Sequence, residues 1–260
     1  MSAIKVQVQM GGLLARVTLS RPEKYNAFDR EMLRELGDLL RGVTESEKLR
    51  VLLITGEGKA FSAGADLQAA VKSDSVSNYL GGLVKSFNSV LQTLAESPAL
   101  VVTLVNGPAA GGGYSLAMAG DLRLALPEAV FRVGYGRAGL PMDGGLSWRL
   151  PRLVGFAQAQ RLVFEDPDVD ADEAHAIGLV HRVVAASEVQ KTVEELIERT
   201  KLQSRSSILR NRQLLLDSQG RTLAATFEAE AILMKTAAGT QDGREGITAF
   251  VEKRPPKFTS

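Results

Sequence analysis

The sequence contains no cysteine and only two histidines among its 260 residues. Without cysteine the chain can form no disulfide, no thiol nucleophile and no cysteine-ligated metal site, which also fits a reducing compartment. The two histidines, His175 and His181, are expected near the surface of a helix–strand connection, and two lone histidines do not make a metal site. The sequence therefore predicts no metal centre.

Neither an excess of one charge nor a long apolar run is present. The sequence has 31 Lys and Arg against 30 Asp and Glu, so its net charge of +1 gives no electrostatic reason to bind nucleic acid or an anionic membrane. No apolar stretch approaches the ~18 residues that span a bilayer. Residues 1–9 also lack the basic start and apolar run of a signal peptide. We therefore expect a soluble, cytoplasmic protein without nucleic-acid or membrane partners.

Apolar residues make up 45% of the chain, enough for a sizeable core. Alternating or continuous apolar runs predict strands at residues 5–9, 13–19, 51–55, 100–105, 122–126 and 130–133. The first two, around Gly11 and Gly12, predict a β-hairpin with a two-residue turn. Asp29 is the expected N-cap of a helix, Asp170 with Glu173 resembles a capping box, and Trp148 is expected in the core.

The remaining spacing predicts helices. Apolar residues recur every three or four positions over 76–94, a small-residue helix is expected at 114–119, and the chain becomes mainly helical from about residue 145. Strands mixed with helices and then a run of helices indicate an α/β fold with a helical C-terminal region.

Two loops rich in small residues follow buried strands. The first contains Gly64 and Ala65, and the second, with the glycines 111–113, opens a helix. The first N–H groups of a helix lack internal partners, and glycine lets a ligand approach them closely. Two such loops could aim two N–H groups at one thioester oxygen, where a single donor can be worth roughly 3 kcal/mol of barrier. The alternative is that each loop is only a tight turn.

The glycine cluster matches neither a Walker loop nor a dinucleotide-binding fingerprint. Instead, four segments together resemble the signature motifs of the crotonase superfamily, the enoyl-CoA hydratase/isomerase family. They are SRPEKYNAFD (residues 20–29), KAFSAGADL (59–67), NGPAAGGGYSLA (106–117) and FVEKRPPKF (250–258). The motifs occur in the family's order and cover essentially the whole chain.

This resemblance implies a spiral of ββα units in residues 1–200, which hold an acyl-CoA site, and a helical trimerisation region in residues 201–260. It implies a homotrimer or a hexamer, an acyl-CoA thioester as substrate, and no cofactor beyond the CoA of that substrate. The oxyanion-hole N–H groups would belong to Ala65 and Gly112. Further positions are implied as CoA contacts: Lys24, Ala27, Ala63, Asp66 and Leu67, with Phe250 and Lys253 reaching the CoA of a neighbouring subunit.

Three of these positions have ordinary structural alternatives. Lys24 and Lys253 could be solvated surface charges, and Asp66 is better explained as a helix cap or a support of its loop than as a chemical group. Candidates for the acyl pocket are residues 68–79 with Phe131, Tyr135 and Trp148, and the sequence does not rank them.

The acid/base groups distinguish reactions within this superfamily. The hydratases that the chain resembles use two glutamates to activate and position water, since water must lose a proton while the α-carbon gains one. The matching positions here are Ser115 and Tyr135, so an ordinary hydratase mechanism is not expected.

Asp143 is the carboxylate of the same region. The segment GLPMDGGLSW (residues 139–148) resembles that of isomerases of the phenylacetate pathway and of misplaced double bonds, where the matching Asp is the catalytic acid/base. Those enzymes have Pro directly before the Asp, whereas Met142 separates Pro141 from Asp143 here. The alternative role for Asp143 is to stabilise a turn beside Gly144.

The resulting hypothesis is an enoyl-CoA isomerase in which Asp143 moves the proton. Hydration with Tyr135 or Asp143 in unfamiliar roles, and a non-catalytic acyl-CoA binder, are the alternatives. Asp143 also matches the nucleophile of a chlorobenzoyl-CoA dehalogenase of the superfamily. That enzyme uses a histidine on the helix after the first loop, and the helix expected here has none.

Overall fold

The computed structural model describes residues 2–218 and 220–259, which form a mixed α/β fold. The larger sheet has the strand order β1-β2-β3-β4-β6-β9, and the smaller has the order β5-β7-β8. The strands are β1 (Ile4–Gln9), β2 (Leu14–Leu19), β3 (Val51–Gly56), β4 (Leu100–Val105), β5 (Ala109–Ala110), β6 (Leu122–Ala125), β7 (Val130–Arg132), β8 (Val169–Asp170) and β9 (Arg182–Val183). In the larger sheet, β1 and β2 are antiparallel and the other pairings are parallel.

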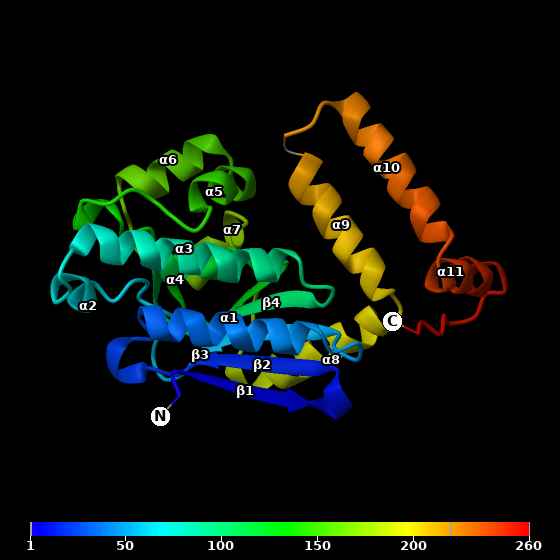
Figure 1. Cartoon of the computed structure of the whole chain (residues 1–260), viewed down its shortest axis with the longest axis horizontal. Coiled ribbons are helices and arrows are strands. Elements are labelled where there is room, and N and C mark those ends of the chain that lie inside the picture. Colours follow the sequence, from blue (N-terminus) through cyan, green and yellow to red (C-terminus); the bar gives the residue numbers. More distant parts are fainter. Residues whose placement is uncertain (1, 219, 260) are drawn as a thin grey trace.

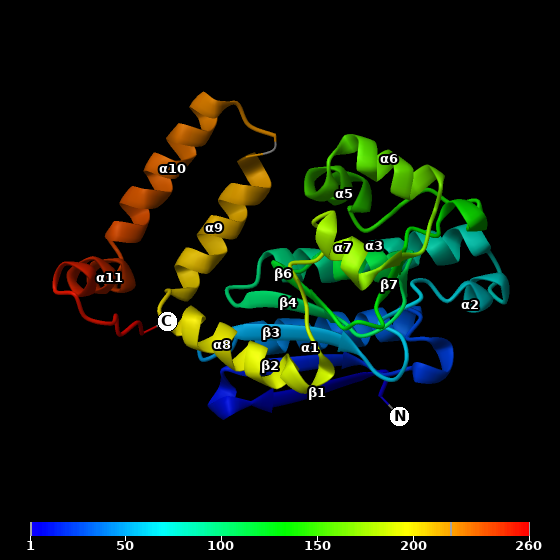
Figure 2. The same cartoon turned by 180° about the vertical axis from the view of Figure 1, so that it is seen from behind.

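Helices cover both faces of the larger sheet. α1 (Arg30–Thr44) and α3 (Val76–Ala95) lie on one face and α8 (Val189–Lys201) on the other (Figures 1 and 2). Successive side chains of a strand point to opposite faces. Accordingly Leu52 and Ile54 of β3 join the core under α1 and α3, while Val51 and Leu53 join the core under α8.

Shorter helices lie around the sheets. They are α2 (Leu67–Val71), α4 (Gly112–Ala117), α5 (Leu146–Val154), α6 (Phe156–Phe164) and α7 (Ala171–Ala176), together with the 3₁₀ turns η1 (Met10–Gly12), η2 (Pro22–Lys24), η3 (Gly136–Ala138) and η4 (Ala186–Glu188). α4 begins at Gly112, two residues before the start expected from the sequence. Gly112 and Gly113 belong to its first turn. The first N–H groups of a helix have no partner within the helix, and glycine leaves them accessible.

The predicted hairpin is confirmed, but its predicted two-residue turn is wrong. β1 and β2 pair from Ile4↔Leu19 to Gln9↔Leu14, so four residues connect them. Met10, Gly11 and Gly12 all have positive φ, of 53°, 68° and 100°. This left-handed run needs the extra length, and the two glycines accept it without strain.

Capping side chains begin several helices where the sequence predicts. Asp29 accepts a hydrogen bond from the Met32 N–H at 2.8 Å at the start of α1. Asp170 accepts from the Glu173 N–H at 2.8 Å at the start of α7. The carboxylate of Glu173 pairs with Arg161, so the acidic residue of the expected capping box serves a tertiary contact.

The C-terminal helices α9 (Arg205–Ser218), α10 (Leu223–Ala238) and α11 (Gln241–Val251) extend away from the sheets (Figures 1 and 2). Arg212 attaches α9 to the rest of the chain. Its buried guanidinium contacts the Asp121 carboxylate at 2.5 and 2.6 Å and donates to the carbonyl of Ala99 at 2.7 Å and to that of Ser97. The division at residues 200 and 201 stays a prediction.

Large apolar side chains on α10 and α11 are exposed in the single chain. They are Leu223, Phe227, Ile232, Met234, Ile247, Phe250 and Val251. Within the part of the chain that the structure describes, no helix is both long enough and apolar enough to cross a membrane.

Candidate active site

The first loop joins the end of β3 to α2 and pairs with residues 25–28. The Phe28 N–H donates to the Gly64 carbonyl at 2.6 Å, and the Asp66 N–H donates to the Phe28 carbonyl at 2.8 Å. Successive N–H groups of an extended chain point in opposite directions, so the N–H of Ala65 faces away from Phe28. Among residues 2–218 and 220–259 it has no acceptor.

The second loop brings another N–H group to the same place. Gly112 is the first residue of α4, and its N–H likewise donates to no described residue. A Cβ on Gly64, whose φ is +82°, would lie 2.6 Å from the Gly112 nitrogen. A Cβ on Gly113 would lie 2.1 Å from the Ser62 carbonyl oxygen. Glycine therefore allows the loops to pack backbone against backbone, with the donors of Ala65 and Gly112 on adjacent segments.

The loops follow neighbouring parallel strands. Thr55 of β3 pairs with Leu104 of β4, so both loops leave the same edge of the larger sheet. Asn106 ties the two strand ends together: its side chain accepts from the Gly56 N–H at 2.9 Å and donates to the Gly58 carbonyl at 3.0 Å. Carboxyl ends of parallel strands are where α/β folds place ligands.

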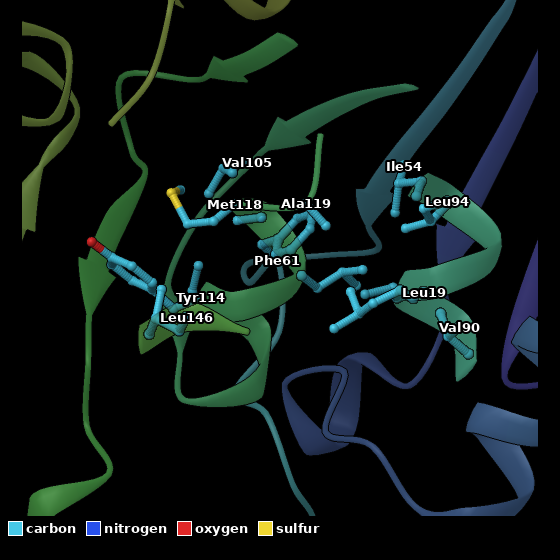
Figure 3. Packing of buried hydrophobic residues seen from close by; sticks show 14 of the residues in the cluster. Leu19, Ile54, Phe61, Val90, Leu94, Val105, Tyr114, Met118, Ala119 and Leu146 are labelled. Carbon is cyan, nitrogen blue, oxygen red and sulfur yellow. The ribbon is translucent and has the colours of Figure 1, made fainter. Parts of the chain in front are cut away.

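Phe61 anchors the first loop in the core. It is fully buried and lies in the middle of the view in Figure 3, with Leu19 and Ile54 on one side and Met118 and Tyr114 on the other. Packing on both sides fixes the loop between the sheet and α4.

Arg21 and Asn26 support the first loop, although the sequence suggested no role for either. Arg21 pairs with Asp29 at 2.8 Å and Asp66 at 3.3 Å, so one guanidinium joins the caps of α1 and α2. The buried amide of Asn26 donates to the Ala60 carbonyl at 2.8 Å. Both residues lie in the motif of residues 20–29, which was the available signal; the partners depend on the fold.

Asp66 is confirmed as a helix cap. It is 7% exposed and accepts from the Ala69 N–H at 3.1 Å at the start of α2. Its other carboxylate oxygen pairs with Arg21, so the protein itself engages both oxygens of Asp66.

Other predicted CoA contacts lie along the two facing segments. The Ala63 N–H donates to the Tyr25 carbonyl at 2.9 Å, next to Lys24 and Ala27. The Lys24 ammonium donates to the Gln68 side chain at 2.8 Å, beside the exposed Leu67. These predicted contacts are therefore brought together.

Phe250 and Lys253 do not join that group within one chain. They belong to α11 and the residues after it, at the opposite end of the molecule from α2 (Figure 1). Phe250 is 85% exposed. A contact with CoA would have to be made with that of another subunit.

Ser115, Tyr135 and Asp143 meet at α4. The Tyr135 hydroxyl donates to Asp143 Oδ1 at 2.5 Å, and the Ser115 hydroxyl lies 2.9 Å from the Tyr135 hydroxyl and 3.0 Å from the Asp143 backbone carbonyl oxygen. Ser115 is fully buried and Tyr135 is 8% exposed, whereas Asp143 is half-buried. Ser115 lies one turn along α4 from Gly111, whose carbonyl accepts the Ser115 N–H at 3.1 Å. The carboxylate is thus tied to the helix that supplies the Gly112 N–H.

Burial governs the electrostatics of this group. It raises the pKa of the Asp143 carboxyl above its ordinary value, and the hydrogen bond from Tyr135 opposes that rise. Burial also raises the pKa of the Tyr135 phenol, and the adjacent Asp143 carboxylate raises it further. Tyr135 therefore stays protonated at neutral pH and remains a donor.

The residue after Asp143 fixes the local backbone. Gly144 has φ +60°, and a Cβ there would lie 2.5 Å from the Phe87 ring and 2.8 Å from Ser115 Cβ. The Asp143 carbonyl also accepts the Leu146 N–H at 3.1 Å as α5 begins. Despite the Met142 that precedes it, the segment is packed against α3 and α4.

Two aromatic candidates for the acyl pocket lie in different environments. Phe131 is fully buried and meets the Tyr114 ring edge-on, with centroids 5.9 Å apart. Trp148 is 37% exposed, so its predicted place in the core is wrong. It faces outward on α5 and stacks with the Arg152 guanidinium at 4.3 Å, because its position in the helix points away from Leu146 and Leu150.

The two histidines are exposed, as expected, and His181 Nδ1 accepts the Arg123 N–H at 3.0 Å. Across residues 2–218 and 220–259, no group of three or more His, Cys, Asp or Glu lies together as a metal site would require.

Comparison with known proteins identifies the family. The family model described as enoyl-CoA hydratase/isomerase matches residues 10–260. The chain belongs to the enoyl-CoA hydratase/isomerase family. The crotonase superfamily and the fold implied by its motifs are thereby confirmed.

Similar members of the enoyl-CoA hydratase/isomerase family include different enzymes. The chain is 34% identical to the 1,2-epoxyphenylacetyl-CoA isomerase of Escherichia coli, with 94% of each chain covered. It is 33% identical to the short-chain-enoyl-CoA hydratase of Clostridium acetobutylicum, covering 96% of this chain and 95% of that one. Among solved structures, an enoyl-CoA hydratase of Bacillus anthracis superposes with a TM-score of 0.90 at 27% identity, with 98% of each chain covered.

Proposed function

We propose that this protein is an enoyl-CoA isomerase that shifts a carbon–carbon double bond of an acyl-CoA thioester. The observation that carries the proposal is the group Ser115–Tyr135–Asp143, in which Asp143 alone has a carboxylate. The N–H groups of Ala65 and Gly112 would hold the thioester oxygen.

The chemistry needs only one carboxylate. Asp143 takes a proton from the α-carbon of a 3-enoyl thioester, and the electron pair delocalises onto the thioester oxygen, where the two N–H donors stabilise the negative charge. Asp143 then returns the proton to the γ-carbon, which leaves the double bond conjugated with the thioester. Because this one side chain both accepts the proton and returns it, the proposed reaction takes no cofactor beyond the CoA of its substrate.

Hydration is the second candidate. It is favoured by the hydratase of C. acetobutylicum among the relatives, as the isomerase of E. coli favours the first. Against it, Ser115 and Tyr135 occupy the positions at which the resembling hydratases have two glutamates. Both hydroxyls are already engaged with each other and with Asp143, which leaves no second carboxylate to activate water.

The proposed assembly is a homotrimer or a hexamer. Its support is the exposed apolar residues of α10 and α11, which a second copy of the chain would cover. In that assembly Phe250 and Lys253 would approach the CoA of a neighbouring subunit. The cytoplasmic location stays a prediction.

The test is the turnover of a 3-enoyl-CoA in D2O, followed by the ultraviolet absorbance of the conjugated thioester and by product mass. Asp143→Asn should lower kcat by about 10²- to 10⁴-fold, the usual contribution of a general acid/base. Asp217→Asn, on the distant α9, is the matched control and should retain wild-type turnover, since its exposed ion pair with Arg221 is not part of the site.

The products separate the alternatives. Conjugation without added water, lost in Asp143→Asn, supports the isomerase. A product heavier by one water supports hydration, and binding of thioesters of several chain lengths with no turnover supports a non-catalytic binder. Unchanged turnover in Asp143→Asn would refute the role of this carboxylate.

A further inference from the structure

The geometry points to Tyr135, held by Ser115, as the residue that positions the Asp143 carboxylate for proton transfer by donating a hydrogen bond to it. This inference rests on the proposed isomerase function.

The two oxygens of Asp143 are not equivalent. Oδ1 accepts the Tyr135 hydroxyl at 2.5 Å. Oδ2 accepts a hydrogen bond from no residue among 2–218 and 220–259, and it is not one of the buried atoms sealed from solvent. The bond from Tyr135 therefore fixes one oxygen and leaves the other open, so Oδ2 is the atom that would exchange protons with the substrate.

Ser115 contacts both the Tyr135 hydroxyl and the backbone of Asp143. The Tyr135 hydroxyl has one hydrogen, which it donates to Asp143 Oδ1. A serine hydroxyl also has one hydrogen, so Ser115 donates it either to the Tyr135 oxygen at 2.9 Å or to the Asp143 backbone carbonyl at 3.0 Å. In either case the Ser115 side chain lies against both the phenol and the Asp143 backbone and limits their movement.

Burial makes this bond consequential. Tyr135 and Ser115 are almost completely enclosed, so bulk water cannot replace a lost hydrogen-bond partner. Losing such a bond therefore costs free energy. A hydrogen bond to an ionised carboxylate favours the ionised form. Tyr135 therefore opposes the effect of burial on Asp143 and keeps more of the carboxylate in the basic state that begins the reaction.

Tyr135→Phe tests this role, since it keeps the ring and removes the hydroxyl. We expect kcat to fall by roughly 10- to 100-fold with little change in KM, because Tyr135 acts through the carboxylate. The acidic limb of the kcat–pH profile should move to higher pH, because losing a donor to the ionised form raises the pKa of Asp143. A residue that only packs would lower kcat equally at every pH.

Two further variants test the support from Ser115 and provide a control. Ser115→Ala should move the limb in the same direction by less, since Tyr135 keeps its hydroxyl but loses its support. Tyr114→Phe is the matched control: the Tyr114 hydroxyl is buried with no partner among the described residues, so its removal should leave kcat and the acidic limb unchanged.

A direct titration separates this inference from the proposed function. The carboxyl of Asp143 is followed by ¹³C NMR of protein labelled at aspartate, with the signal assigned by its absence in Asp143→Asn. A higher titration midpoint in Tyr135→Phe supports the inference even if the wild type fails to isomerise a 3-enoyl-CoA, which would refute the function alone. An unchanged midpoint in a folded Tyr135→Phe variant overturns the inference, even if isomerisation is observed. If Tyr135→Phe does not fold, the midpoint of Ser115→Ala decides in the same way.

Discussion

At the scale of single residues, the buried position of Asp143 destabilises the charged form of its carboxylate. Burial raises its pKa, and one strong hydrogen bond from Tyr135 only partly offsets this. Active sites frequently contain groups that are unfavourable for folding and suited to proton transfer.

Replacing Asp143 by Asn should therefore stabilise the fold at neutral pH while it removes activity. The Asn Oδ1 can still accept the Tyr135 hydrogen, and no desolvated charge remains. Because the folded pKa lies above the unfolded value of about 3.9, the wild type loses stability as pH rises between the two values. The excess in melting temperature of Asp143→Asn should grow across that window and stay constant above it.

Thermal melts from pH 3 to pH 8 check this expectation. Asp217→Asn should follow the wild type closely, since an exposed ion pair contributes little. A melting difference for Asp143→Asn that is the same at every pH would show that the carboxylate is not destabilised in the fold.

Sequence reasoning selected Asp143, because its motif is local, but it could not reveal the bond from Tyr135. Tyr135 lies at the start of η3 and Asp143 in the segment before α5, and only the packing of both against α4 brings the two side chains to 2.5 Å. The same limitation explains Trp148. Its size suggested the core, but the face of α5 that is buried is decided by neighbours far away in the sequence.

At the scale of elements, periodicity predicted the long strands and helices well. β3, β4, α1 and α3 carry continuous or regularly spaced apolar residues, so their side chains alone define the buried faces. Connections were less predictable, as the four-residue turn between β1 and β2 illustrates, because turn geometry depends on φ angles that several residue types adopt.

The packing of the two loops gives a prediction at this scale. Gly64→Ala would place a methyl group 2.6 Å from the Gly112 nitrogen and impose a strained φ, so the loops must separate. The N–H groups of Ala65 and Gly112 that we propose as the oxyanion hole would move apart, so kcat should fall by about 10²-fold or more.

Gly42→Ala is the matched control for Gly64→Ala. No atom lies within 4 Å of its added Cβ, and within α1 the change should increase stability by up to about 1 kcal/mol without affecting turnover. Steady-state kinetics with a 3-enoyl-CoA and thermal melts of both variants provide the measurement. Wild-type kcat in Gly64→Ala would contradict the role assigned to the loop backbone.

At the scale of the whole molecule, the C-terminal helices leave apolar side chains uncovered. Arg212 fixes α9 to the sheet end of the chain, while α10 and α11 carry the exposed residues. The α/β architecture could be predicted from the sequence, but the apolar residues of these helices do not reveal whether they face the same chain or another.

Phe227→Asp tests the proposed assembly. The side chain is 60% exposed on α10, and a carboxylate there would be buried at a contact between copies, so association should weaken at least about tenfold. Sedimentation velocity over a range of protein concentrations measures this. Val8→Asp, an exposed position on the edge strand β1, is the control and should sediment as the wild type does. A wild type that sediments as a monomer at every concentration would refute the assembly.

The N–H donors of Ala65 and Gly112 belong to the main chain, which has a consequence for the evolution of this fold. Short of proline, no substitution at either position deletes an N–H group. In the proposed mechanism, mutations at Ser115, Tyr135 and Asp143 can therefore change which proton moves while activation of the thioester is inherited intact. A lineage built on this scaffold could exchange one reaction for another through ancestors that each retained a working core.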